Sequence, residues 1–301
     1  ANPFMGTGEI AALAAAVFWA AASLWYGKTN LSAWGMNLGK NVLASLILLV
    51  QLYVMSSLTH ADMFQADSHA WSWLSLSGVV GIMIGDTCYF RSLQILGPRK
   101  ALIVSTTAPI FGAILGYLLL DEAVTVTIAV GILVTTAAVA WVVSDGRSTD
   151  EAPGLFPGST FTGVAVGILG AICQAVGAVC SKIGMQSCEP IEAALIRLAV
   201  SAVGAFVVVA ALGQVKSVIT KLADVSLLRR FVPAVITGTW LGIWLCQVAF
   251  KHATVSVAIT LLATTPLFVI PLVRIFYGHR VSGVAVAGTV LAIFGVYLVV
   301  S

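Results

Sequence analysis

Three ionisable side chains lie inside long apolar stretches of this sequence: Lys40, Asp86 and Arg197. A charge inside a membrane-spanning helix costs roughly 2.5–3.5 kcal/mol on insertion scales, so each needs a partner, a water-filled cavity or a function. Tyr89 lies on the same helical face as Asp86, which places a carboxylate beside an aromatic surface. We interpret Asp86 as a group that binds a substrate ammonium or takes up a proton; the alternative is a structural ion pair or hydrogen bond between helices.

Lys40 and Arg197 are 157 residues apart and hold equivalent positions in the two halves of the chain. Asn37 and Asn41 share a helical face with Lys40. Either cation could hold a substrate carboxylate or pair with Asp86. The alternative is that both side chains extend toward the lipid headgroups.

Aromatic and amide side chains supply further candidates for a substrate site. Trp19 and Gln174 occupy nearly matching positions in the first and sixth apolar spans, and Trp240, Trp244 and Gln247 share one face at helical spacing. We interpret these five as possible lining of a substrate cavity. Trp residues also anchor helices at membrane interfaces, and the small residues around Trp19 and Gln174 also favour close helix packing.

Pro109 and Pro266 stand at corresponding points of the fourth and ninth spans. Proline removes a backbone donor and kinks a helix, which frees carbonyl groups that can line a cavity. The symmetric placement predicts a hinge or cavity role for both; a purely structural bend is the alternative.

Long apolar helices must position all of these residues. Hydrophobic residues make up 59% of the 301 residues, charged residues 9%, and the mean hydropathy is +1.04, which excludes an ordinary soluble domain. The apolar runs approach the roughly 20 residues that cross a bilayer as helix, which excludes a β-barrel. The expected spans are 8–28, 33–56, 72–93, 99–120, 124–144, 161–184, 190–213, 230–251, 253–276 and 281–301.

The ten spans divide into two repeats. A constant spacing of 157 residues matches Lys40 with Arg197 and Pro109 with Pro266. The predicted organisation is a first five-helix repeat over 1–144, a connecting loop over 145–160 and a second five-helix repeat over 161–301. Five spans per repeat require the second copy to be inverted in the membrane, with a pseudo-two-fold axis in the membrane plane.

Several functional classes lack support in the sequence. It has no nucleotide-binding, zinc-protease or serine-hydrolase motif, so we expect no catalytic residue, no metal and no cofactor. The five cysteines form no CxxC and are interpreted as apolar fillers. The net charge of +3 has no basic cluster with aromatics behind it, so we expect no nucleic-acid partner. The first span has no basic n-region or cleavage site, so we do not interpret it as a signal peptide.

Lys and Arg collect on one side of the expected membrane. The connections after odd-numbered spans hold or border Lys28, Arg99, Lys100, Arg147, Lys216, Lys221, Arg229, Arg230 and Arg280. The positive-inside rule therefore places that side in the cytoplasm and both termini outside.

Four sequence segments resemble the first half of EamA-like permeases of the drug/metabolite transporter superfamily: residues 85–93, 97–101, 108–113 and 120–125, with a second copy of the pattern at 257–268. The resemblance implies a ten-helix bundle with a central cavity, with the fifth and tenth helices at the periphery, and metabolite movement without ATP. Members of this family are more often drawn with termini inside. The acidic residue of the family pattern is Glu122 in the first half but His279 in the second, which departs from a symmetric pair of carboxylates.

The residues and the resemblance together predict an all-α integral membrane protein that acts as a secondary transporter of small polar metabolites, with amino acids or related amines as the expected class. The alternatives are a quaternary amine or drug-like cation as substrate, or an ion channel. The expected partners are a small-molecule substrate, the lipid bilayer of a bacterial cytoplasmic (inner) membrane, and a proton as a candidate coupling ion. The sequence does not specify an oligomeric state.

Overall fold

A computed structural model of the chain describes residues 6–26, 31–60, 62–144, 159–277 and 282–301. Most of the predicted connecting loop 145–160 lies outside these residues, as do Lys28, Arg147, His279 and Arg280. The described chain is all-α, as predicted, and contains no β-strand.

The first half begins with two long helices, α1 (Thr7–Tyr26) and α2 (Ala33–Thr59). The third span is a continuous rod of α3 (Ser68–Ser77), the π-helix η1 (Gly78–Asp86) and α4 (Thr87–Leu96). The fourth span is split into α5 (Pro98–Ser105) and α6 (Ala108–Leu120), and α7 (Val126–Ser144) is the fifth.

The second half repeats this order. It consists of α8 (Thr160–Gly184), α9 (Pro190–Ala211), a short α10 (Val215–Leu222), the rod of α11 (Val225–Ala234), η2 (Val235–Leu241) and α12 (Gly242–His252), the split pair α13 (Val255–Leu262) and α14 (Thr265–Tyr277), and α15 (Gly283–Val300). The third and eighth spans extend beyond the predicted limits, and α10 occupies a stretch that was expected to be loop.

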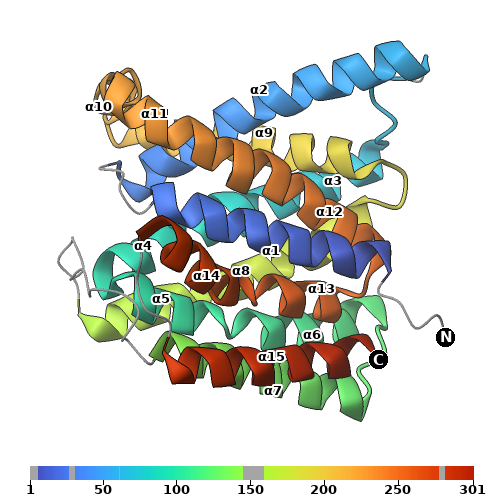
Figure 1. Cartoon of the computed structure of the whole chain (residues 1–301). Helices are drawn as coiled ribbons and strands as arrows, with labels where there is room; N and C mark the ends of the chain where they lie inside the picture. The colour runs from blue at the N-terminus through green and yellow to red at the C-terminus, as the bar shows by residue number, and fades with distance from the viewer. Residues whose placement is uncertain (1–5, 27–30, 61, 145–158, 278–281) are drawn as a thin grey trace.

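Ten segments of the described chain fit a membrane-spanning role. Nine are long and apolar enough to cross a bilayer, and a shorter apolar segment over Val255–Val269 takes the tenth place. The helices lie side by side, and the start of α1 and the end of α15 are at the same end of the bundle (Figure 1). Helices α7 and α15 pack mainly on each other at the edge of the bundle, as the fifth and tenth helices were expected to do.

The two halves match element by element. Helices α9, α13, α14 and α15 and the π-helix η2 each begin 157 residues after α2, α5, α6, α7 and η1. Helices α1 and α8 run in opposite directions, because Gly8 at the start of α1 and Lys182 near the end of α8 both contact Ala253. Inverted repeats require such opposed directions; the domain limits and the position of the symmetry axis stay predictions.

The centre of the bundle is a seam between the halves. Helix α1 packs on α12, α2 on α9, and η1 on α8. Alanine fills much of the core on α1, and glycines bring η1 and α8 together, since a Cβ atom at Gly177 would lie 2.6 Å from the Cα atom of Gly81. Small side chains at helix contacts let backbones approach closely in lipid.

Pro109 and Pro266 lie beside the breaks in the fourth and ninth spans, and their hinge or cavity role stays a prediction. Each lies at the second position of its helix, directly after the break between α5 and α6 or between α13 and α14, where a missing N–H costs no intrahelical bond. The carbonyl groups before the breaks accept from threonine hydroxyls: Thr107 donates to Val104 O at 2.7 Å and Thr264 to Leu261 O at 2.6 Å. The Val104 and Leu261 carbonyls are therefore engaged within their own helices.

Candidate functional site

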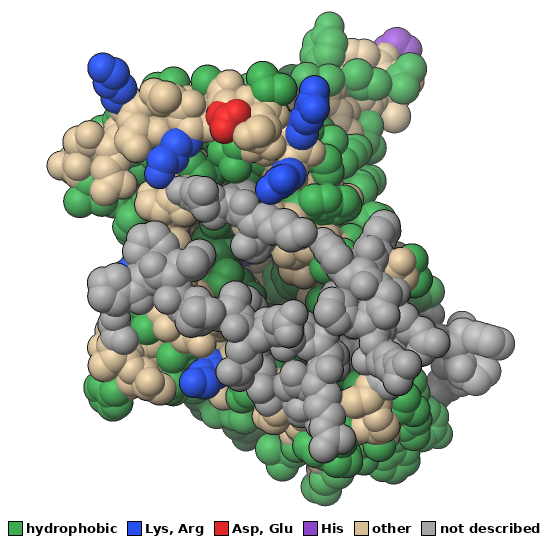
Figure 2. All heavy atoms as spheres, turned by 60° about the vertical axis from the view of Figure 1, so that its left-hand side comes forward, with side chains coloured by type: hydrophobic (Ala, Val, Ile, Leu, Met, Phe, Trp, Pro, Cys, Tyr) green, Lys and Arg blue, Asp and Glu red, His purple; other side chains and the backbone are tan. Residues whose placement is uncertain are grey.

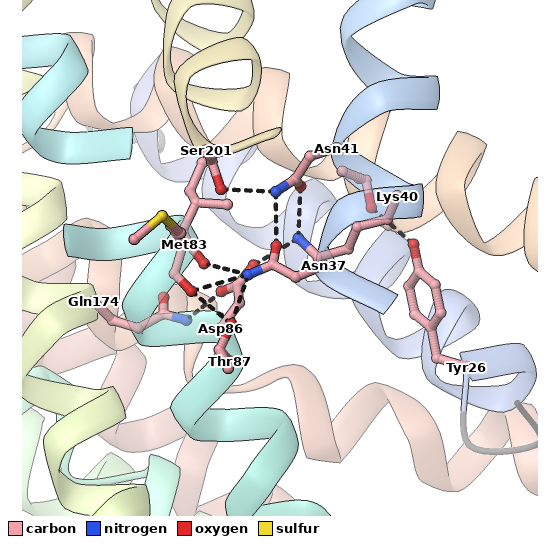
Figure 3. Close-up of polar contacts among 12 residues, drawn as sticks. Tyr26, Asn37, Lys40, Asn41, Met83, Asp86, Thr87, Gln174 and Ser201 are labelled. Carbon is pink, nitrogen blue, oxygen red and sulfur yellow. Dashed lines mark hydrogen bonds and ion pairs between the residues drawn. The ribbon is translucent and has the colours of Figure 1, made fainter. Parts of the chain in front are cut away.

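Asp86 forms a buried ion pair with Lys40. The Lys40 Nζ atom is 2.7 Å from Asp86 Oδ2, and the two side chains are 4% and 18% exposed. Lys40 Nζ also donates to Asn41 Oδ1 at 3.0 Å and lies 5.9 Å from the centre of the Phe90 ring. Lys40 thus does not extend to the headgroups, and the pairing that the sequence left open is observed (Figure 3).

Asn37 holds α2 against η1 and the start of α4. Asn37 Nδ2 donates to Ile82 O at 2.9 Å, to Met83 O at 3.0 Å and to Thr87 Oγ1 at 2.9 Å. A π-helix has a wider turn than an α-helix and is frequent at functional sites. Asn37 donates hydrogen bonds to backbone carbonyl groups of η1, and Asp86 is the last residue of this π-helix. The bonds that stabilise the wide turn therefore also hold Asp86 in position.

Asn41 extends the network to the second half of the chain. Its Nδ2 atom donates to Asn37 Oδ1 at 2.7 Å and to Ser201 Oγ of α9 at 2.8 Å (Figure 3). The sequence placed both asparagines on the Lys40 face without giving them a role. Their helical spacing from Lys40 was the available signal.

Gln174 brings α8 to the same carboxylate. Its Nε2 atom donates to Asp86 Oδ1 at 3.1 Å, so both Asp86 oxygens are engaged, one by each half of the chain. The Gln174 side chain is exposed although it lies in the middle of α8, and Asp86 is partly exposed. Polar groups that are exposed in the interior of a membrane bundle indicate a space that water or a polar solute can enter.

Aromatic side chains border the ion pair. Tyr89 is partly buried, and its ring centre is 5.8 Å from that of Phe90, which in turn faces Lys40. Tyr26 of α1 bonds Thr239 Oγ1 of η2 at 2.8 Å. Tyr89 follows Asp86 by three residues at the start of α4, about one helical turn away.

The tryptophans make helix contacts. Trp19 Nε1 donates to Gly238 O of η2 at 2.8 Å, and Trp240 Nε1 donates to Gln51 Oε1 of α2 at 2.7 Å. Trp240 and Trp244 pack on the same apolar cluster, whereas Gln247 is fully buried and accepts from Ser181 of α8. Trp240 and Trp244 therefore share a neighbour, whereas Gln247, in the same α-helix as Trp244, contacts α8 instead.

Arg197 is buried and forms no ion pair with another described residue. Its side chain is 5% exposed, and Nε and Nη1 have no hydrogen-bond acceptor among the described residues. The site thus brings together Lys40, Asp86 and Gln174, with Tyr89 one helical turn after Asp86, and Arg197 makes no direct bond to them. The substrate-binding role of every candidate remains a prediction.

A second polar cluster lies at the end that carries both termini. Glu122, 8% exposed, accepts from Val255 N through both oxygens at 2.8 Å, and its Oε1 atom is 3.1 Å from Lys182 Nζ. A carboxylate at a helix N-terminus is favoured by the orphan N–H groups and the helix dipole. Glu122 therefore ties the turn before α7 to the start of α13.

A hollow of about 400 Å³ at the same end is lined by Glu9, Lys182, Lys251 and His252, but by none of the residues around Asp86.

The cysteines carry no bond to one another. Burial raises the pKa of the Cys188 thiol to about 12. All five cysteines are free, as expected of fillers. The Asp67 carboxylate accepts hydrogen bonds from the Ala70 backbone N–H and from the Ser187 hydroxyl, and both bonds lower the pKa of Asp67.

The opposite end is basic. Figure 2 shows Lys and Arg side chains on the part of this face formed by α10 and α11. The exposed cations there are Lys216, Lys221, Arg229 and Arg230. The charge asymmetry expected from the sequence is present among the described residues.

Comparisons with known proteins agree with this architecture. The model of the EamA-like transporter family matches residues 6–144 and 161–301. No curated protein matches the chain. Among solved structures, a chain described as "Crystal structure of protein" is similar over 97% of this chain and 96% of its own length, with a TM-score of 0.73 and 13% identity. That identity establishes likeness of fold alone.

Proposed function

Because the chain belongs to the EamA-like transporter family, it is a multi-pass membrane transporter and not an enzyme, and we propose that it moves small polar metabolites by alternating access without ATP. Amino acids or related amines are the substrate class that the site favours. The observation that carries this proposal is the Lys40–Asp86 ion pair on the seam between the halves, with the exposed Gln174 beside it.

A substrate ammonium can compete with Lys40 for Asp86. The carboxylate is partly exposed, and Tyr89 offers an aromatic surface next to it. Binding of the substrate cation would replace one charged partner of Asp86 by another, so the carboxylate is never left unpaired in a low-dielectric interior. Uptake of a proton by Asp86 would release Lys40 in the same way, which makes the proton the candidate coupling ion.

The seam also suggests how the site is exposed in turn to each face. Asp86 is held by Lys40 of the first half and Gln174 of the second, so movement of one half against the other changes the partners of the carboxylate. The close glycine contact between η1 and α8 carries no side chain that must be displaced before such a shift.

The test is solute flux into proteoliposomes. Purified protein is reconstituted without ATP, and counterflow of labelled amino acids, primary amines and choline is measured for the native chain, for Asp86→Asn and for the exposed loop variant Asp62→Asn. We expect amino acid or amine counterflow that Asp86→Asn reduces at least tenfold and Asp62→Asn leaves unchanged. Equal flux in all three would overturn the role of Asp86.

A quaternary amine or drug-like cation is the second candidate substrate. Lys40 Nζ lies 5.9 Å from the Phe90 ring centre, so this site already holds a cation against an aromatic face. Choline flux without amino acid flux would favour this second candidate.

We further propose that the protein lies in a bacterial cytoplasmic membrane with its basic end inside and both termini outside. The support is the exposed Lys and Arg on α10 and α11. Single cysteines at Ser217 and Ala66, in a background without native cysteines, are labelled in intact cells with an impermeant maleimide. Labelling at Ala66 alone is expected; labelling at Ser217 alone would mean that the termini are inside.

A further inference from the structure

Arg197 is a buried cation that lacks a carboxylate partner among the described residues, unlike Lys40, the equivalent residue of the first repeat. In the first half, Lys40 pairs with Asp86 at 2.7 Å. In the second half, Arg197 corresponds to Lys40, but Ile243 stands 157 residues after Asp86. The repeat therefore supplies two cations and one carboxylate, and two Arg197 nitrogen atoms have no acceptor among the described residues.

No described residue supplies the acceptors that the Arg197 Nε and Nη1 atoms need. Charged groups inside a membrane bundle normally pair with each other or with backbone carbonyls, because an unpaired buried charge is costly. Arg197 is 5% exposed, so bulk water does not solvate it, and its Nε and Nη1 atoms lack even a carbonyl partner. The missing acceptor must be an anion or water that enters the site.

A glycine lies against one edge of the guanidinium. A Cβ atom at Gly81 would lie 3.3 Å from Arg197 Nη2, so this position next to the guanidinium has no space for a larger side chain. Gly78, the first residue of η1, packs on the Arg197 backbone, and Asp86 is the last residue of the same π-helix.

We propose that Arg197 binds the anionic group of the transported molecule, a carboxylate, while the ammonium of the same molecule meets Asp86. The planar fork of arginine matches a carboxylate with two parallel hydrogen bonds, which a lysine does not. Arg197 and Asp86 are then opposite ends of one site for a zwitterion. This inference rests on the proposed function and narrows its substrate class from amines in general to α-amino acids.

The first test compares three matched solutes in the counterflow assay: leucine, leucinamide and 3-methylbutan-1-amine. All three carry the ammonium and the same side chain, but only leucine has a carboxylate. The native protein should prefer leucine at least tenfold. Arg197→Gln should lose leucine flux by at least that factor and retain the amine flux, and Ser45→Ala, which also removes a buried unpartnered polar atom, should behave like the native chain.

Direct anion binding to Arg197 is measured separately, because the flux assay fails if leucine is not a transported solute. The melting temperature in detergent is followed against sodium acetate, chloride or sulfate at constant ionic strength, using the native chain, Arg197→Gln and Arg197→Lys. A saturable acetate shift that is lost in Arg197→Gln and weakened in Arg197→Lys supports the carboxylate site. A shift with chloride or sulfate but not acetate would assign Arg197 to an inorganic anion and overturn the proposal.

The outcomes separate the two proposals. Equal flux of the three solutes by the native chain, or an acetate response that is unchanged in Arg197→Gln, overturns the carboxylate site and leaves the transporter proposal standing. Absence of flux for every solute, together with an acetate shift that depends on Arg197, overturns the proposed amino acid or amine class and supports the anion site. If the Arg197→Gln variant does not fold, the proposal is decided by two other measurements. These are the acetate response of Arg197→Lys and the preference of the native chain for leucine.

Discussion

Replacing Asp86 by asparagine keeps the shape of the side chain but leaves the Lys40 ammonium buried without an opposite charge. Breaking a buried pair from one side costs about 3–5 kcal/mol. Asp86 is 18% exposed and Lys40 keeps its bond to Asn41, so the loss is smaller here. A hydrogen bond to a charged group contributes about 1.5–3 kcal/mol, and we expect the free energy of unfolding to fall by about 2 kcal/mol.

The assay is a double-mutant cycle of Asp86→Asn and Lys40→Met, with reversible unfolding followed in detergent. Because the two groups are in direct contact, we expect a coupling energy of about 1–2 kcal/mol. The matched control is the Lys251–Glu189 pair, which has a similar distance of 3.0 Å but is 27% and 61% exposed. Glu189→Gln should cost at most about 1 kcal/mol. If the Lys40 and Asp86 changes simply add, the ion pair is not a stabilising partnership and the reasoning fails.

Local contacts give three further predictions. Glu122→Gln should lower the free energy of unfolding by about 1–2 kcal/mol, because the start of α13 loses a buried anion, whereas the exposed Asp121→Asn should be neutral; equal effects in thermal melts would refute this. Gly177→Ala places a methyl group against η1 and should cost about 1–3 kcal/mol, while Gly283→Ala, with no atom within 4 Å of the new carbon, should cost less than about 0.5 kcal/mol; a Gly177→Ala melt like that of the native chain would show that the helices are not in contact there. The lowered pKa of Asp67 stabilises the fold above the carboxyl pKa of the unfolded chain, about 3.9, and this stability is lost as the pH falls, so melting from pH 5 to pH 3 should be steeper for the native chain than for Asp67→Asn; identical slopes would contradict the assignment.

The sequence predicted the framework of the fold because length and hydropathy determine it. Runs of about 20 apolar residues cross a bilayer wherever they occur, and the 157-residue repeat was visible in Lys40 and Arg197. The candidate ion pair followed from the cost of isolated charges in lipid. Hydropathy, charge and repeat spacing are properties of the sequence itself, so one sequence is enough to detect these signals.

The π-helices η1 and η2 were not predictable in the same way. Their wide turns depend on contacts from other helices, such as Asn37 on the carbonyls of Ile82 and Met83, and no residue pattern within η1 itself records them. The helix-capping role of Glu122 also depends on where α13 begins in space, which the sequence order alone does not give.

Alternating access to the site beside Asp86 is the central claim of this account, and the exposed Gln174 allows it to be measured directly. A single cysteine at Gln174, in a background without the five native cysteines, is reconstituted in one orientation. An impermeant maleimide is then supplied either outside the vesicles or inside them. The account predicts labelling from both sides, slowed by a transported amino acid. Labelling from one side only, with and without solute, or no labelling from either side, would contradict it.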